Sequence, residues 1–341
     1  MYINFMNEGN KNIYISSWLL LITLLIAIMI IIGGLTRLTD SGLSITEWQL
    51  FSGILPPLNN AEWDNYFDLY KTIPEFKLQN YSMSLNEFKI IFWWEWTHRF
   101  LGRLIGISFL LPLIYFTITL GFKKLKRLYF IFFLICLQGF VGWYMVISGL
   151  TDRVDVSHYR LALHLIIAFF IFSLILWDYF KLKNIALSHR KLKFFLPLIF
   201  LILLFFQISI GAFVSGMDAG TIYNTWPLMG SSFFPDDNEF SNIFKISAFN
   251  EPSLVQFFHR ILAYIIFIYY LFLVYKIYKG SLVRYFYPIK IIGLLLILQI
   301  VLGIFTLLYG AQIYLASMHQ ISSIFLVSLS VYFLFLNSNT N

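Results

Sequence analysis

The sequence has 341 residues, of which 59% are hydrophobic and only 12% are charged. Soluble domains carry about 25% charged residues, so this composition excludes an ordinary soluble enzyme. The net charge of +7 does not indicate nucleic acid as a partner, because the basic residues lie in short loops beside long apolar runs. Apolar runs of about 20 residues cross a bilayer as helices. We therefore expect an all-α integral membrane protein.

Eight membrane spans are expected in chain order. They lie at residues 17–36, 91–118, 128–148, 160–180, 194–215, 256–276, 286–308 and 314–336. The only cysteine, Cys136, falls inside the third span. An intramolecular disulfide and a thiolate metal cluster are therefore excluded.

The loops between the spans differ in charge. Three short loops are basic, and their charged residues are Lys123, Lys124, Lys126 and Arg127, then Lys181, Lys183, Arg190, Lys191 and Lys193, then Lys276, Lys279 and Arg284. The long connections 37–90 and 216–255 are rich in Asp and Glu. Basic loops stay on the cytoplasmic side of a membrane. We expect a multi-pass protein of the cell inner (cytoplasmic) membrane, with both termini cytoplasmic and both long connections outside.

The first long connection contains an apolar pattern of its own. Trp63, Phe67 and Tyr70 recur at helical spacing. A short helix on the outer surface explains this pattern, although ordinary packing of a loop explains it nearly as well.

The two halves of the chain repeat each other. Three matches share one sequence offset: Ile32-Gly33-Gly34 with Ile210-Gly211-Ala212, Asp40-Ser41-Gly42 with Asp218-Ala219-Gly220, and Trp48 with Trp226. Two more share a second, smaller offset: His98-Arg99 with His259-Arg260, and Leu137-Gln138 and Gly142 with Leu298-Gln299 and Gly303. The offset falls because the first long connection is longer than the second. The repeat predicts two tandem four-helix bundles, residues 1–183 and residues 184–341.

Four of the six histidines share one depth. His98, His164, His259 and His319 lie near the outer ends of spans two, four, six and eight. A lone histidine in a span is usually a polar group bonded between helices, but two per repeat at equal depth favour two bis-histidine haem sites. Zinc and copper are disfavoured because no further ligand completes either site. The remaining histidines, His158 and His189, are expected to be solvated.

Three arginines follow the histidines closely. Arg99, Arg103 and Arg260 are candidate partners of haem propionates, because a guanidinium group binds a carboxylate in a bidentate fork. An arginine that reaches toward the membrane surface, or pairs with an acid at a helix end, is the alternative.

Glu95 is the residue that distinguishes the halves. It lies one helical turn before His98 on the same helix face, and the offset that matches His98 with His259 matches Glu95 with Gln256. A haem that only relays electrons needs no carboxylate, whereas oxidation of a haem requires proton transfer or stabilisation of positive charge. An acid at a helix entry is the alternative. The asymmetry favours a substrate haem in the first half and a permanent redox haem in the second.

Four stretches of the sequence resemble the haem A synthase family. They are GGLTRLTDSGLSITEW at Gly33–Trp48, FWWEWTHRFLGRLIG at Phe92–Gly106, GMDAGTIYNTWP at Gly216–Pro227 and VQFFHR at Val255–Arg260. The resemblance runs from about residue 15 to the end. Some members carry a cysteine pair in the first outer loop, and this sequence resembles the branch that lacks it.

The resemblance implies an oxidoreductase that oxidises the C8 methyl group of haem O to a formyl group, giving haem A for terminal oxidases. It implies that His259 and His319 bind a retained haem b, that His98 and His164 face the substrate haem iron, and that Glu95 is catalytic. Haem O synthase, a protoheme farnesyltransferase, and an unidentified electron donor are the implied partners. A di-haem b-type electron-transfer cytochrome and a haem delivery protein remain as alternatives.

Overall fold

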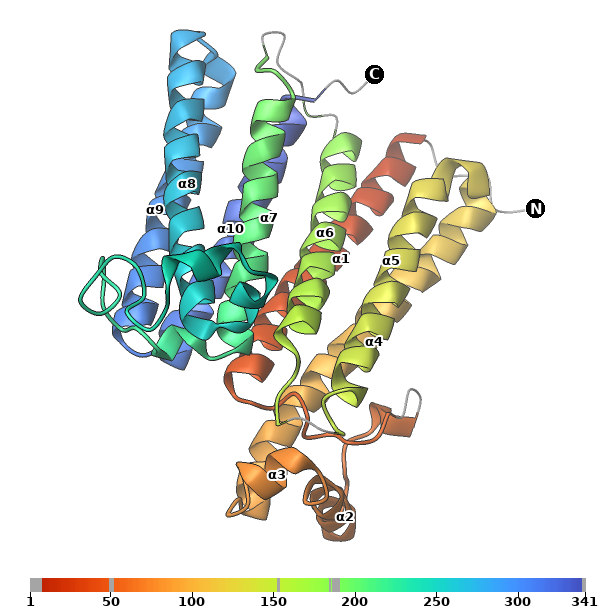
Figure 1. Ribbon diagram of the computed structural model, residues 1–341. Helices are drawn as coiled ribbons and strands as arrows, with labels where there is room; N and C mark the ends of the chain where they lie inside the picture. The colour runs from red at the N-terminus through yellow and green to blue at the C-terminus, as the bar shows by residue number, and fades with distance from the viewer. Residues whose placement is uncertain (1–7, 49–51, 152–153, 184, 186–190, 339–341) are drawn as a thin grey trace. The chain divides into compact units, whose positions relative to one another are not determined.

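The computed structural model describes residues 8–48, 52–151, 154–183, 185 and 191–338. Within these ranges, eight helices are long and apolar enough to cross a membrane. They are α1 (Glu8–Leu38), α4 (Leu85–Leu120), α5 (Phe122–Ile147), α6 (His158–Leu182), α7 (Phe195–Gly216), α8 (Pro252–Lys279), α9 (Phe286–Leu308) and α10 (Ile313–Leu336) (Figure 1). A helix satisfies its backbone hydrogen bonds internally, which hydrocarbon requires. The chain is an all-helical, multi-pass membrane protein, as its sequence predicts.

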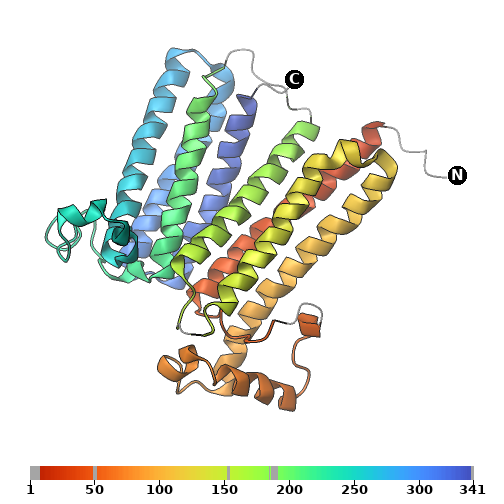
Figure 2. The ribbon, with the colours of Figure 1, turned by 45° about the vertical axis from the view of Figure 1, so that its right-hand side comes forward.

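The chain forms two compact units. One contains residues 24–171, and the other contains residues 1–23 together with residues 172–341. The first unit holds the later part of α1, all of α4 and α5, and the first part of α6. The second holds α7 to α10, which lie side by side in Figures 1 and 2. The predicted halves 1–183 and 184–341 follow the sequence repeat, and the duplication itself stays a prediction.

Several helices begin earlier than the sequence predicts, and the early starts of α4 and α5 have local reasons. The second span is predicted from residue 91, but α4 begins at Leu85 because Ser84 and Glu87 form a capping box at its start. The basic residues 123–127 are predicted to lie in a loop, but they lie in the first turns of α5. A single residue, Gly121, connects α4 to α5 with a positive φ of 82°. Arg190 and His189 lie outside the described residues.

The first long connection forms a helical cap at the start of α4. It contains α2 (Asn60–Tyr70) and α3 (Pro74–Leu78), after a short 3₁₀ turn, η1 (Ser52–Ile54) (Figure 2). The expected short helix is confirmed, and its three spaced aromatic side chains are buried in α2. Their rings lie against two phenylalanines of α4, Phe88 and Phe92. Aromatic packing therefore fixes this connection to the membrane helix.

A carboxylate is buried inside this cap. Glu75, on α3, is only 3% exposed. It accepts a hydrogen bond of 3.1 Å from the Tyr70 hydroxyl at Oε1. Burial, opposed in part by this hydrogen bond, raises the pKa of Glu75 to about 8.

The second unit has its hydrophobic core toward the end of the helices that lies away from its long loop. Phe200, Leu273, Tyr285, Ile292 and Phe333 are fully buried in one core formed by α7 to α10 and the 3₁₀ turn η5 (Val283–Tyr285). The long loop of this unit contains three further 3₁₀ turns, η2 (Ala219–Thr221), η3 (Phe240–Phe244) and η4 (Ile246–Asn250).

Candidate functional site

In the first unit, two histidine rings face each other between helices. His98 on α4 and His164 on α6 have ring centres 6.4 Å apart and planes at 80°. These helices are the second and fourth spans, on which the sequence predicts histidines at equal depth. The structure therefore brings together the two residues that the sequence assigns to the substrate haem.

The second unit contains a matching pair. His259 on α8 and His319 on α10 have ring centres 6.4 Å apart and planes at 73°. Among the described residues, no group of three or more His, Cys, Asp or Glu side chains gathers at one point. Each candidate centre is therefore a histidine pair rather than a multi-ligand metal cluster.

Each histidine ring lies against a glycine of the preceding helix. The pairs are Gly33 with His98, Gly142 with His164, Gly211 with His259, and Gly303 with His319. A methyl group added at these glycines would lie 2.9 to 3.2 Å from the nearest ring atom. Contacts this close are rare for a side chain, so glycine is needed for each ring to occupy its position. The sequence repeat had matched these glycines without giving a reason for them.

Replacing Gly303 by Ala should displace the His319 ring, since the new methyl group would lie 3.0 Å from Cε1. Overpacking of this kind costs about 1–3 kcal/mol. We expect lower thermal stability and a lower b-type haem content, measured by optical spectroscopy of the detergent-extracted protein. Gly139→Ala is the matched control, because a methyl group at Gly139 meets nothing within 4 Å. Equal behaviour of the two variants would contradict this role for glycine.

Glutamine side chains support the histidine helices. Gln138 donates to the backbone carbonyl of His164 at 2.9 Å, and Gln207 donates to that of His259 at 3.0 Å. His319 Nδ1 lies 3.1 Å from the backbone oxygen of Gln299. His164 Nδ1 is buried and has no hydrogen-bond partner among the described residues.

The residues of each pair fit a haem. An iron held by two imidazole nitrogens at about 2 Å each needs ring centres about 6 Å apart, which matches both observed spacings. Small residues flank every ring, and the orphaned Nδ1 of His164 shows that the described residues alone do not satisfy that imidazole. The spacing of the rings in each pair is therefore compatible with a haem held between them.

Glu95 lies beside the first pair and is completely enclosed. It is 2% exposed and lies well inside α4, which begins at Leu85, so it is not a helix-entry acid. Its Oε1 accepts two hydrogen bonds from Arg99, at 3.0 and 2.5 Å. Its Oε2 accepts from the Ser44 hydroxyl at 2.8 Å and from the Ile45 backbone N–H at 2.7 Å. Glu95 therefore joins α4 to the segment that follows α1.

The three arginines proposed to bind propionates differ in how many hydrogen bonds they already make within the protein. Besides Glu95, Arg99 donates to the backbone carbonyls of Ile45 and Glu47. Arg260 donates to three carbonyls of the second long loop and, weakly at 3.4 Å, to Gln256. Its Nε is buried and has no partner among the described residues. Arg103 is half-buried on α4, one turn beyond Arg99.

His158 does not match its expected place. It is the first residue of α6 rather than a loop residue, and its Nε2 atom is buried. The expectation that it is solvated is therefore wrong. Its ring lies against that of Tyr159, with ring centres 4.2 Å apart.

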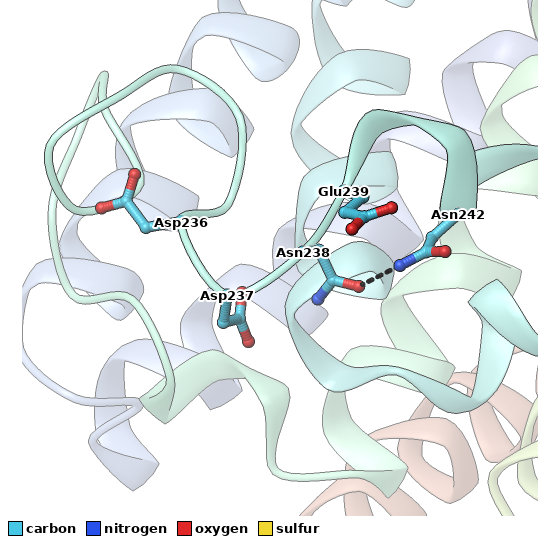
Figure 3. Close-up of a pocket in the computed structure, with 5 residues that line it drawn as sticks. All are labelled: Asp236, Asp237, Asn238, Glu239 and Asn242. Carbon is cyan, nitrogen blue, oxygen red and sulfur yellow. Dashed lines mark hydrogen bonds between the residues drawn. The ribbon is translucent and has the colours of Figure 1, made fainter.

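The hollow on the second long loop is not part of either histidine site. Asp236, Asp237, Asn238, Glu239 and Asn242 line it, and Figure 3 shows Asp236 set apart from Glu239 rather than converging with it. Asp236 accepts from Ser231, which lowers the pKa of its carboxyl, and Asp237 accepts from the Tyr223 hydroxyl. These acids hold turns of the loop in place.

A family model described as cytochrome oxidase assembly protein matches residues 16–331. The chain belongs to this family. Among its relatives is a protein of Pelagibacter ubique named "Heme A synthase", 47% identical over 99% of this chain and 100% of the relative. Proteins of the same name from Bradyrhizobium diazoefficiens (43% identical, 92% of this chain and 89% of the relative) and Rickettsia bellii (42%, 93% and 96%) are also similar.

In this member of the cytochrome oxidase assembly family, one residue of the site is not predicted by the sequence pattern. Ser44, which bonds to Glu95, lies in the GGLTRLTDSGLSITEW stretch, but no chemistry is assigned to it from the sequence. The internal repeat does contain evidence that Ser44 is special to the first unit. The offset that matches Gly33 with Gly211 matches Ser44 with Ile222, a difference that parallels the one between Glu95 and Gln256.

Proposed function

We propose that this chain is a haem A synthase, an oxidoreductase that converts the C8 methyl group of haem O to a formyl group for the assembly of terminal oxidases. The carrying observation is the contrast between two equally spaced histidine pairs, of which, among the described residues, only the first has a buried carboxylate one helical turn from a histidine. Similar proteins are named "Heme A synthase", which supports haem A as the product.

The second pair, His259 and His319, would hold haem b through their imidazole nitrogens. When bound, haem b supplies one-electron transfer. Gln256 stands where the first unit has Glu95, so this site keeps a neutral amide beside its histidines. A permanent redox group requires no proton acceptor at its edge, which supports this assignment.

The first pair, His98 and His164, would orient haem O by its iron. Oxidation of a methyl group to an aldehyde moves protons as well as electrons, and Glu95 is the buried group able to hold a proton there. In its ionised form, the same carboxylate stabilises positive charge that develops on the substrate. Arg99 and Ser44 hold it in one orientation.

Arg99, Arg103 and Arg260 are the proposed partners of the propionates. Arg260 can offer its unpartnered Nε–H without giving up its loop contacts, which supports it most directly. Arg99 would have to exchange part of its contact with Glu95 or the loop.

Co-expression with a haem O synthase in a host that makes no haem A tests the function. We expect extracted haem to contain haem A, separated from haem O by reverse-phase chromatography. A di-haem electron-transfer cytochrome would use the same two histidine pairs, and a haem delivery protein would bind haem without turnover. Either alternative predicts unchanged haem O.

The basic ends of the helices support an orientation with both termini in the cytoplasm of an inner-membrane protein. A reporter fused near Lys124 or Arg190 should be cytoplasmic, and one near Asp64 or Asp237 should be external. Because all four paired histidines would then lie toward the outside, a cytoplasmic reporter at Asp64 would contradict the proposed side of the reaction.

A further inference from the structure

Both units contain the same arginine clamp, which we define as the contacts of Arg99 and of Arg260 with loop carbonyls. Arg99 donates to the carbonyls of Ile45 at 2.7 Å and Glu47 at 3.0 Å. Arg260 donates to those of Tyr223 at 3.0 Å and Thr225 at 2.9 Å. These loop positions correspond in the repeat, because the offset that matches Trp48 with Trp226 also matches Ile45 with Tyr223 and Glu47 with Thr225. The clamp is therefore a common structural device and does not distinguish the two sites.

Two side chains at the clamp do differ. The first unit has Glu95 and Ser44, and the second has Gln256 and Ile222 at the corresponding positions. The Gln256 amide donates to the Tyr223 carbonyl at 3.2 Å, and Ile222 is half exposed, at 49%. The carboxylate and the hydroxyl that bonds to it thus occur together in one unit, whereas the other unit has an amide and an alkyl group at these positions.

The partners of Glu95 differ in what they can accept. Arg99 and the backbone N–H of Ile45 only donate hydrogen bonds, so they suit the ionised carboxylate. Ser44 can donate and accept. Its hydroxyl, 1% exposed, also lies 3.3 Å from the Ile91 carbonyl, a second acceptor. When Glu95 holds a proton on Oε2, that proton can point to Ser44 Oγ while the hydroxyl hydrogen turns to Ile91.

We propose that Ser44 is a positioning residue that keeps Glu95 Oε2 in one place whether Glu95 is ionised or holds a proton. This inference rests on the proposed function. Two ionisable groups that interact with Glu95 are Arg99, in contact on its own helix, and Glu75 of α3, whose pKa burial raises and the charge of Glu95 raises further. Arg99 has no acceptor atom, and the hydrogen bonds of Glu75 go to Tyr70 and Asn80, so Ser44 is the partner suited to both states of Glu95.

The test compares Ser44→Ala with Ser44→Thr, which restores a hydroxyl, in the full chain co-expressed with a haem O synthase. Ser41→Ala is the matched control, because Ser41 is a fully buried serine of the same segment whose hydroxyl bonds to Thr39 instead. Haem b absorbance, optical titration with haem O, and the extracted haem composition are measured for each. Mutation of a group that orients a metal ligand typically costs about ten- to a hundredfold in activity, and we expect a loss of the same order when Glu95 loses the hydroxyl that orients it.

We expect Ser44→Ala to keep haem b and to bind haem O nearly as the parent does, while haem A formation falls about ten- to a hundredfold. Ser41→Ala should retain most activity, and Ser44→Thr should regain most of what Ser44→Ala loses. Normal haem A formation by Ser44→Ala would overturn the proposal. So would equal losses in the Ala variants of Ser44 and Ser41, or loss of haem O binding in Ser44→Ala. If the parent chain itself made no haem A, the proposed function would fail instead.

Discussion

Replacing Glu95 by Gln is expected to reduce haem A formation by about 10²–10⁴-fold, the usual contribution of a group that transfers protons. The substitution copies the residue of the second unit at position 256 and preserves the shape of the side chain. It removes the negative charge that Arg99 contacts, and the single amide oxygen can accept either from Arg99 or from Ser44 and Ile45, but not from both sides. The protein should assemble and keep haem b, because the second histidine pair lies in the other unit.

Extraction of haem followed by reverse-phase separation measures this effect, with haem O or a partly oxidised haem accumulating. Gln256→Glu is the reciprocal change in the second unit. It removes the amide donor to the Tyr223 carbonyl, so haem b is measured first, and protein that retains haem b should still form haem A. A normal haem A yield from Glu95→Gln would show that Glu95 only holds the loop in place and has no part in the oxidation. Loss of haem b together with haem A would point to misfolding rather than chemistry.

Replacing His259 or His319 by Ala should remove most of the b-type haem, because each would supply one of the two imidazole nitrogens proposed to hold it. The same substitution at His98 or His164 should leave that haem in place and stop turnover. Optical spectra of the purified variants, normalised to protein, separate the two outcomes. The side-chain atoms removed are the same at all four positions, so the comparison is internally matched.

The assignment of one permanent and one substrate site requires this difference between the pairs. If all four variants lose the same haem to the same extent, the two pairs do not have separate roles. Substitution of His259 by Met would add a second check. The thioether sulfur is a weaker iron ligand than imidazole, so the haem spectrum should shift rather than disappear.

Much of this fold is predictable because the signals are local. Runs of apolar residues define all eight spans, and the spacing of Trp63, Phe67 and Tyr70 predicts α2. Histidine depth along each span also predicts that the rings meet in pairs. The starts of α4 and α5 are harder to predict from the sequence, because a capping box and a one-residue turn extend these helices into polar sequence.

The surroundings of Glu95 could not be predicted in the same way. Helical periodicity indicates the face on which Glu95 lies but not the loop backbone that meets this face. Its contacts with Ser44 and Ile45 join segments far apart in the sequence, and the arginine clamp binds carbonyl groups, which every residue possesses. Only the three-dimensional structure distinguishes the anchoring contacts common to both units from the hydroxyl found in one.

Glu75 makes the α2–α3 cap at the start of α4 more stable at acidic pH than at alkaline pH. Its carboxyl has a pKa of about 8 in the folded chain against 4.5 for an ordinary glutamate, so the folded state retains a proton that the unfolded state has released. Below about pH 4.5 both states hold this proton and burial of the group carries no ionisation cost, whereas above about pH 8 the cost is complete and amounts to a few kcal/mol. The α2–α3 segment should therefore loosen progressively as the pH rises through this range. With the segment outside the membrane, as proposed, an acidified exterior would tighten the packing of this cap on α4, and an alkaline one would relax it.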